Sequence, residues 1–366
     1  RTNERTCSIN MRAPIPRLYM GTMTFAWKGQ TSSVVDEIVG LEMVQKFIDH
    51  NEKYGEKTHL IDTARVYAAG KTEPMVGDVL KKVKVPAGSQ MKVGTKANPA
   101  MEGGLSTEGI QSQLKESLEA MQLTNLGEYY LHQPDTSHSL LESFQCTHKL
   151  IAEEGTATAL GMSNYHAMEM RRAFELCQEH NLTPPTVYQG LYNPLNRMVE
   201  EELLPLLRKH DCQFVAYNPL AAGLLAGKHK SVDQVAEGRF KDNQNYLPRF
   251  YTEENFKALE LIREACDKEG ISMVEASYRW LLRHSALDPQ KDGILLGASS
   301  VSQLEQNLDA CNAAAEKGPL SNELLAAFDK AWELTKEGAF PYWRSYSSDF
   351  PNRESLDQGA SYAVKK

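Results

Sequence analysis

Cysteine is scarce in this sequence, and its spacing argues against several classes of site. The 366 residues include six cysteines, and no two of them form a Cys-x-x-Cys pair. A zinc ribbon, a thioredoxin-type redox centre and a disulfide framework all need closely spaced or paired cysteines. We therefore interpret all six as small buried hydrophobic residues of a protein from a reducing compartment: Cys7, Cys146, Cys177, Cys212, Cys266 and Cys311.

Long apolar runs and an excess of positive charge are also missing. No apolar run approaches the roughly 18 residues that would cross a bilayer. Lys and Arg total 40 against 48 Asp and Glu, a formal net charge of −8, which argues against a broad phosphate-binding surface. The first ten residues are polar and resemble no secretory signal. We expect a cytoplasmic protein that acts on a small molecule, with no nucleic-acid or membrane partner, and a homodimer remains open.

Neither glycine-rich nucleotide motif, GxGxxG or GxxxxGK[ST], is present. This absence counts against a doubly wound open sheet, the second candidate fold. The chain does contain short apolar runs that alternate with longer stretches in which apolar residues recur at helical spacing. This alternation of expected strands and helices favours a (β/α)₈ barrel. The expected strands are 18–20, 59–61, 91–94, 128–131, 157–160, 186–188, 213–216 and 293–296, and the expected helices are 39–47, 73–82, 110–121, 139–153, 168–180, 200–209 and 302–313.

Two segments exceed a minimal barrel. A long loop rich in Gly, Asn, Lys and Arg runs from residue 216 to a helix beginning near residue 253. A further helix is expected at 323–335, followed by a tail with the aromatic-arginine cluster 340–344. We expect one domain, with the barrel at 17–336 and the tail at 337–366 covering the substrate side of the rim.

Polar residues follow seven of the expected strands, where barrel enzymes place their chemistry. They could reflect ordinary loop polarity, but together they would form a polar ring on one rim. These residues are Asp62, Thr95, Lys96, His132, Gln133, Ser163, Asn164, Gln189, Tyr217, Asn218, Ser299 and Ser300.

Four of the expected site residues suggest acid catalysis. Tyrosine has an ordinary pKa near 10, and the ammonium of Lys96 would lower that of Tyr67 by favouring the phenolate. Asp62 would hold Lys96 charged and in place, while a neutral His132 would orient a substrate carbonyl. The result is a general acid for a developing alkoxide. Nothing in this set is redox-active, so an organic hydride donor is implied.

At this point the sequence resembles the aldo-keto reductases. Glycine and aromatic patterns at 223–227 and 276–281, with the aromatic-arginine tail, are most similar to the aflatoxin-aldehyde and succinic-semialdehyde reductase branch. The resemblance covers roughly residues 17 to 344. The motifs occur in order as GTM at 21–23, IDTARVY at 61–67, VGTK at 93–96, LHQPD at 131–135, GMSNY at 161–165, YQ at 188–189, AYNPL at 216–220 and GASS at 297–300.

The resemblance implies roles for individual residues, with NADPH as cofactor and no metal. Tyr67 would donate the proton, with Asp62, Lys96 and His132 in support, and His132 and Arg344 would bind substrate. Ser163, Asn164 and Gln189 would hold the nicotinamide carboxamide, and Tyr217 would stack on its ring. The full set implied to bind the cofactor is Met23, Ser163, Asn164, Gln189, Tyr217, Asn218, Pro219, Leu220, Gly223, Leu224, Gly227, Lys228, Arg239, Ser299, Ser300, Gln303, Gln306 and Asn307.

The sequence departs from the family pattern in two places. Many members carry a basic residue just after the turn that follows the eighth strand, whereas this chain has Val301, Ser302 and Gln303. Recognition of the 2′-phosphate of NADPH is therefore expected from Arg239. The chain also continues from Ser345 to Lys366. That extension could narrow the pocket, redirect Arg344 or contact a second subunit.

Simpler structural readings accompany these roles. Asp62 and Lys96 could be an ion pair that closes the rim, His132 a core histidine, and Tyr217 an apolar plug. Arg344 could be a surface arginine beside packed aromatic rings.

Competing functions are also open. A nucleotide-binding regulatory subunit with negligible turnover, like the potassium-channel β subunits of this fold, is the main alternative. A barrel glycosidase would leave the lysine and the tyrosine unexplained.

Overall fold

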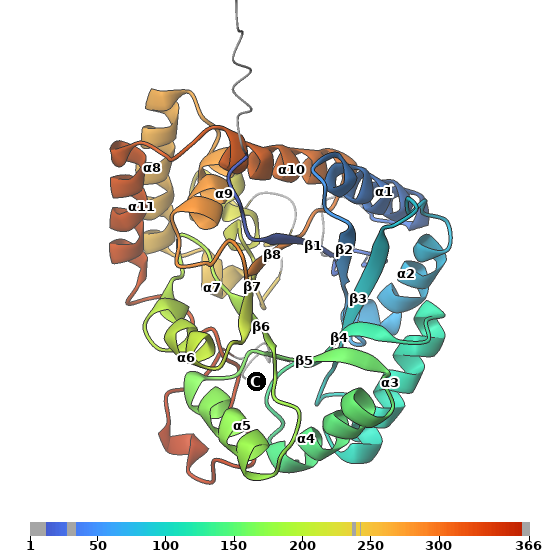
Figure 1. Ribbon diagram of the computed structural model, residues 1–366. Coiled ribbons are helices and arrows are strands. Elements are labelled where there is room, and N and C mark those ends of the chain that lie inside the picture. Colours follow the sequence, from blue (N-terminus) through green and yellow to red (C-terminus); the bar gives the residue numbers. More distant parts are fainter. Residues whose placement is uncertain (1–11, 28–33, 236–238, 242, 361–366) are drawn as a thin grey trace, which may run out of the picture.

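A computed structural model describes residues 12–27, 34–235, 239–241 and 243–360. Eight parallel strands close into a barrel in sequence order, with β8 returning to pair with β1 (Figure 1). The (β/α)₈ prediction is confirmed. The strands are β1 (Arg17–Gly21), β2 (Thr58–Asp62), β3 (Gln90–Ala97), β4 (Leu126–Leu131), β5 (Ala157–Ser163), β6 (Val187–Leu191), β7 (Gln213–Tyr217) and β8 (Gly293–Leu296).

Helices surround the strands on the outside (Figure 1). Most begin at a polar cap, as Ser106 shows by accepting a hydrogen bond from the backbone N–H of Gly109 at 3.1 Å. The helices are α1 (Glu37–Lys53), α2 (Thr72–Leu80), α3 (Thr107–Met121), α4 (Leu140–His148), α5 (Ala167–Glu179), α6 (Leu203–Lys209), α7 (Leu247–Phe250), α8 (Glu253–Glu269), α9 (Met273–Arg283), α10 (Val301–Glu316) and α11 (Asn322–Thr335).

Two expected helices differ from those observed. The helix expected at 139–153 ends as α4 at His148 and continues as one π turn over Lys149–Glu153. The helix expected at 200–209 begins only at Leu203, after a 3₁₀ turn over Met198–Glu200.

The barrel interior is stacked in three layers, because alternate residues of each strand face inward. Glycines make room for the large rings of the middle layer. A Cβ on Gly161 would lie 2.2 Å from Tyr130, and one on Gly293 would lie 2.5 Å from Tyr19. The middle layer is apolar, and its members are Tyr19, Leu60, Tyr130, Val187, Val215 and Leu295.

Polar layers lie on both sides of this apolar layer. Two residues further along β2, β4, β6 and β7 come Asp62, His132, Gln189 and Tyr217, at the C-terminal rim. Two residues back along β1, β2, β4 and β7 come Arg17, Thr58, Glu128 and Gln213, at the N-terminal end. The sequence analysis pointed only to the first of these two layers.

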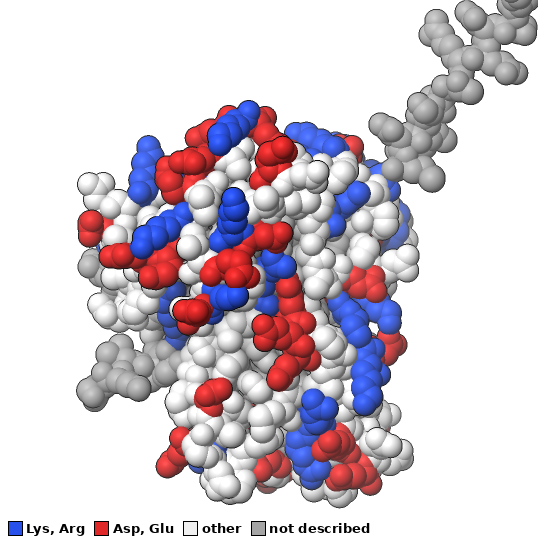
Figure 2. All heavy atoms as spheres, turned by 90° about the vertical axis from the view of Figure 1, so that its left-hand side faces the viewer, with Lys and Arg blue, Asp and Glu red and all other residues white. Residues whose placement is uncertain are grey.

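The outer surface is charged but mixed in sign. The face that carries α8 and α11 shows acidic and basic side chains interspersed (Figure 2). Several are neighbours along one helix, such as Lys257 with Glu253 and Lys336 with Glu333. Within the described ranges, no helix is long and apolar enough to cross a membrane.

The described cysteines are all buried and unpaired, as expected, and burial raises the pKa of each thiol: Cys146, Cys177, Cys212, Cys266 and Cys311. Cys7 lies outside the described residues.

Candidate active site

The C-terminal rim brings Asp62 and Lys96 into direct contact. The Lys96 ammonium is fully buried and lies 2.7 and 2.8 Å from the two carboxylate oxygens of Asp62. Its third hydrogen bond goes to the carbonyl of Thr63 at 2.6 Å. Gln189 also donates to Asp62, at 2.9 Å. All three N–H groups of the Lys96 ammonium and both oxygens of the Asp62 carboxylate therefore have hydrogen-bond partners, as burial of an ion pair requires.

Tyr67 lies above this pair in the short loop after β2. Its backbone N–H donates to the carbonyl of Ala64 at 3.0 Å, which closes the turn. The two residues that follow, Ala68 and Ala69, have left-handed backbones with φ of 48° and 54°. Lys96 Nζ lies 5.4 Å from the centre of the Tyr67 ring, and the His132 ring lies 6.0 Å away, edge-on. The four residues expected to act together thus lie together.

Burial sets the protonation of both rings. It raises the pKa of Tyr67 well above its ordinary value, and the negative charge of Asp62 adds to this. Desolvation of the phenolate by burial is the largest effect, so this pKa is raised overall, and the lowering expected from Lys96 stays a prediction. Burial also lowers the pKa of His132 well below its ordinary value, assisted by the positive charges of Lys96 and Arg344. Tyr67 is therefore a protonated hydroxyl and His132 a neutral imidazole at neutral pH.

The hydrogen bonds of Asn98 define the tautomer of His132. The side-chain oxygen of Asn98 accepts from the N–H of Ala100 at 2.9 Å, so its amide nitrogen faces the imidazole. That nitrogen lies 3.1 Å from His132 Nδ1. An amide nitrogen only donates, so Nδ1 accepts and the ring proton is on Nε2. His132 can then donate a hydrogen bond from Nε2.

Asn164 links several parts of the rim. Its amide nitrogen donates to the carbonyl of His132 at 2.8 Å and to Ser163 Oγ at 2.9 Å. Its side-chain oxygen accepts from the Tyr217 hydroxyl at 2.9 Å. Its carbonyl accepts from the N–H of Arg344 at 3.0 Å, which attaches the tail. Asn164 is buried and adopts a left-handed backbone, φ 64°.

The turn between β8 and α10 is held by residues expected to bind the cofactor. Ser300 caps α10 and accepts from the N–H of Gln303. The Gln303 side chain accepts from the N–H and the hydroxyl of Ser299, both at 3.0 Å. Asn307 donates to the carbonyl of Gly297 at 3.2 Å. Gln303 and Asn307 therefore shape the turn with their side chains, and Gln306 is exposed on the same helix.

The loop after β7 carries the remaining expected residues. Asn218, Gly223 and Gly227 all have positive φ, and Asn218, Pro219 and Leu220 follow the strand directly. Leu224 is fully buried in the main core, so only its backbone can face a ligand.

The cationic candidates of this loop differ in their surroundings. Lys228 is exposed, whereas the Arg239 guanidinium stacks 5.4 Å above the ring of Tyr246. Met23 follows β1, which neighbours β8 in the barrel, and is partly buried.

The tail returns over the rim and places Arg344 at the site. Burial lowers the pKa of Arg344 to about 10, and the ionisable groups close enough to influence it include Tyr217, Arg249, Tyr246 and Tyr67. The His166 ring packs against three tail aromatics, Tyr342, Trp343 and Tyr346.

Comparison with known proteins agrees with this geometry. The family model described as "Aldo/keto reductase family" matches residues 17–333. The chain belongs to the aldo-keto reductase family.

Individual relatives span most of the chain. "Aflatoxin B1 aldehyde reductase member 2" of Mus musculus is 36% identical over 347 residues, which cover 91% of this chain and 89% of that protein. "Aldo-keto reductase family 7 member A3" of Homo sapiens is 38% identical, with 78% and 87% covered. "Aflatoxin B1 aldehyde reductase member 4" of Homo sapiens is 39% identical, with 75% and 84% covered.

Two residues of this aldo-keto reductase were missed by the sequence analysis. Tyr246 and Arg249 come from the long loop and from α7, yet both lie close enough to influence the ionisation of Tyr217 and Arg344 at the rim. Neither follows a strand, so the rule that located the other rim residues could not find them. The only available signal was their place in a long loop rich in aromatic and basic residues.

The extension after Arg344 packs on its own chain. The N–H of Ser347 donates to the buried Glu169 at 2.7 Å, and the N–H of Ser348 donates to the carbonyl of Asp135 at 3.0 Å. The N–H of Ala360 returns to the carbonyl of Trp343 at 2.7 Å. These contacts hold the extension against the segment that carries Arg344, and the three roles considered for the extension stay predictions.

Proposed function

We propose that this aldo-keto reductase reduces aldehydes and ketones to alcohols, with NADPH as hydride donor and Tyr67 as proton donor. The observation that carries the proposal is the grouping of a protonated Tyr67, a neutral His132 and the buried Asp62–Lys96 pair at one rim. Reduction of a carbonyl needs a proton for the developing alkoxide and a donor that orients the carbonyl oxygen. These residues supply both.

The roles follow from the available hydrogen-bonding groups. His132 Nε2 donates to the carbonyl oxygen and fixes its position. The Tyr67 hydroxyl donates its proton to the same oxygen as negative charge develops there. Lys96 has no N–H bond left for Tyr67, since all three are used, so it stabilises the phenolate through its charge. Asp62 keeps that charge in place.

The rim also fits a nicotinamide carboxamide, which carries one acceptor oxygen and one donor NH₂. Within the described ranges, no partner takes the Ser163 hydroxyl proton, because Ser163 Oγ only accepts from Asn164. Gln189 donates to Asp62 and keeps its side-chain oxygen available as an acceptor. A donor from Ser163 and an acceptor from Gln189 match the amide. Reduced nicotinamide, when bound there, supplies the hydride.

A preference for NADPH over NADH is proposed on the basis of Arg239 and the N-terminus of α10. A helix N-terminus favours a phosphate group, and α10 begins immediately after Ser300. Arg239→Ala should weaken NADPH binding by about 10-fold or more and NADH binding much less, since only NADPH carries the 2′-phosphate. Fluorescence titration of both nucleotides measures this. Equal losses would show that Arg239 does not recognise the 2′-phosphate.

The central test is Tyr67→Phe, which removes only the hydroxyl. We expect kcat for a good aldehyde to fall by roughly 10²–10⁴-fold, the usual effect of a general acid, while NADPH affinity stays nearly unchanged. The measurement is cofactor absorbance in single-turnover experiments, where chemistry limits the rate. A Tyr67→Phe variant with the wild-type rate would refute the mechanism. A wild-type protein that binds NADPH and reduces no carbonyl would instead support the regulatory-subunit alternative.

A further inference from the structure

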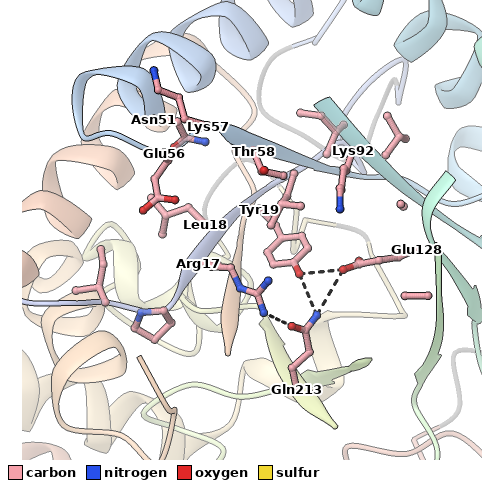
Figure 3. Close-up of a pocket in the computed structure, with 18 of the residues that line it drawn as sticks. Arg17, Leu18, Tyr19, Asn51, Glu56, Lys57, Thr58, Lys92, Glu128 and Gln213 are labelled. Atoms are coloured by element: carbon pink, nitrogen blue, oxygen red, sulfur yellow. Dashed lines mark hydrogen bonds between the residues drawn. The ribbon is translucent and has the colours of Figure 1, made fainter. Parts of the chain in front are cut away.

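A pocket opens at the end of the barrel opposite the rim described above, at the N-terminal ends of the strands (Figure 3). Its volume is about 500 Å³, within the range of sites for small organic molecules. We call it the basal pocket. It is lined by strand-start residues such as Arg17, Thr58, Lys92 and Glu128, and by Asn51 and Tyr54 near the end of α1. In barrel enzymes this end is not where catalysis occurs, so the family's reaction does not account for the basal pocket.

The apolar middle layer separates the basal pocket from the proposed catalytic site. Tyr130 lies between the two ends, with Lys96 Nζ 5.4 Å from the centre of its ring and its hydroxyl bonded to Glu128 at 2.5 Å on the basal side. Tyr19 and Leu60, of the same layer, also line the basal pocket. A ligand here would therefore not contact the rim residues.

Basic side chains outnumber acidic ones around the basal pocket. One of its two carboxylates, Glu128, is already hydrogen-bonded by the hydroxyls of Tyr19 at 3.0 Å and Tyr130 at 2.5 Å. Burial also raises the pKa of Glu128. The cationic lining residues are Arg12, Arg17, Lys57 and Lys92, and the acidic ones are Glu56 and Glu128.

Lys92 differs from the other three cationic residues in its hydrogen bonding. Arg12 bonds to Asn312, Arg17 to Gln213 and Lys57 to Glu52. The Lys92 ammonium, by contrast, makes no hydrogen bond or ion pair with any part of the chain that the structure describes, although its backbone pairs within the barrel. Figure 3 shows its side chain turned into the pocket, toward Tyr19 and Glu128.

The position of Lys92 depends on a neighbouring glycine. A Cβ on Gly127 would lie 2.9 Å from the Cβ of Lys92, so the absence of a side chain there leaves room for the lysine. The ammonium thus enters the pocket from β3, while the Arg17 guanidinium enters from β1.

Part of the outer wall of the basal pocket is apolar, and polar residues such as Asn51 and Glu56 line the rest. Ile15, Pro16 and Leu18 lie on the β1 side, and the ring of Tyr54 lies on the α1 side. The Arg12 guanidinium stacks 3.6 Å above that ring. A ligand that satisfies the whole lining needs an acidic group for the cations and an apolar part for this wall.

We propose that the basal pocket binds a small organic anion, whose acidic group contacts Lys92 and Arg17 and whose apolar part packs against Leu18 and Tyr54. This site is distinct from the proposed substrate site, and the proposal holds whether or not the protein reduces carbonyls.

The test uses 2-naphthoate as the anion and 2-naphthamide as its uncharged match. Binding is measured by calorimetry on full-length protein saturated with NADP⁺, so that the proposed nucleotide phosphate sites are filled. We expect 2-naphthoate to bind and 2-naphthamide to bind at least about 10-fold more weakly. Lys92→Met keeps the aliphatic stem and removes the charge, and it should weaken 2-naphthoate binding by about 10-fold or more, which corresponds to about 1.4 kcal/mol.

Three controls make the outcome decisive. Lys115→Met makes the same change on the exposed face of α3 and should leave binding unchanged. Arg344→Met removes the rim cation that is proposed to bind carboxylates, and the 2-naphthoate binding that remains in this variant should be lost when Lys92→Met is added to it. Lys92→Gln and the thermal midpoint of each variant test for a folding defect. Binding that survives Lys92→Met and Lys92→Gln in the Arg344→Met background, binding lost entirely in Arg344→Met alone, or no 2-naphthoate binding at millimolar concentration would each overturn the proposal.

Discussion

At the scale of single residues, the hydrogen bonds of Lys96 determine what it can do in the candidate site. Its three N–H bonds reach the two oxygens of Asp62 and the carbonyl of Thr63. The residue types at the strand ends could be predicted from the sequence, because polar residues interrupt buried runs there. The direction of the Tyr67 pKa could not, since it depends on how much water burial removes from that hydroxyl.

The guanidinium of Arg344 leads to a prediction about substrate charge. It lies at the rim near Tyr67 and Tyr217, where a guanidinium can clamp a carboxylate. Arg344→Ala should lower kcat/KM for a carboxylate-bearing aldehyde by about 1.5–3 kcal/mol, the usual contribution of a charged hydrogen bond. A neutral aromatic aldehyde should lose much less. Steady-state kinetics on succinic semialdehyde and on a nitrobenzaldehyde provide the comparison.

Two other results would change the role of Arg344. Equal losses on both aldehydes would indicate that the side chain mainly supports the fold of the tail. No loss on either would place Arg344 outside the substrate site.

At the scale of elements, the tail depends on contacts between residues far apart in the chain. Ser347 bonds to Glu169, which lies 178 positions earlier. Gly359 packs so closely on the Arg344 segment that a Cβ there would lie 2.2 Å from the carbonyl oxygen of Arg344. The extension therefore bears directly on the backbone that carries Arg344.

Gly359→Ala should displace the extension and loosen Arg344. We expect a lower thermal midpoint and a reduced preference for the carboxylate-bearing aldehyde over the neutral one. Gly338→Ala is the matched control, because its added Cβ would meet nothing closer than 4.0 Å. Calorimetric melting and the ratio of kcat/KM values on the two aldehydes test both variants. A Gly359→Ala protein that retains the wild-type ratio would show that the extension does not position Arg344.

The elements also show where prediction from sequence succeeds. All eight strands were located within a few residues, because a strand buried on both faces is a short apolar run between helical periods. The same reasoning missed α7 and its Arg249, which lie in the long loop between β7 and α8. Their places depend on packing against distant partners, such as Phe340, whose ring lies 5.6 Å from the Arg249 guanidinium. The spacing of apolar residues along the sequence cannot predict a contact of this kind between distant residues.

At the scale of the whole molecule, buried histidines and buried carboxyls act on stability in opposite directions. A histidine with a lowered pKa binds its proton more readily when unfolded, so its stabilising effect is lost as pH falls below about 6.5. A carboxyl with a raised pKa stabilises most at low pH, and its effect is lost as pH rises through the folded value. Burial raises the pKa of Glu73 and Glu128, and that of Glu169 to about 8. Burial lowers the pKa of His50, His59, His132, His166, His210, His229 and His284.

Because these histidines outnumber the three carboxyls, the free energy of unfolding should fall as pH is lowered from 7 to 5. Each net proton bound on unfolding changes it by about 1.4 kcal/mol per pH unit. Glu169→Gln removes one opposing group and should make this dependence steeper. Denaturant unfolding of both proteins at pH 7, 6 and 5 measures the slopes. A flatter slope in Glu169→Gln would contradict a carboxyl that is protonated in the folded protein.

The bonds around Asn164 have a consequence for how this protein could evolve or be engineered. One residue joins the end of β4, the neighbouring Ser163, the Tyr217 hydroxyl and the backbone of the tail. A tail grafted from a related barrel would move Arg344 and pull on the same residue that is proposed to contact the nicotinamide. We therefore expect substrate range and cofactor affinity to change together in such variants. Variants selected for a new substrate through the tail should carry compensating changes beside Asn164.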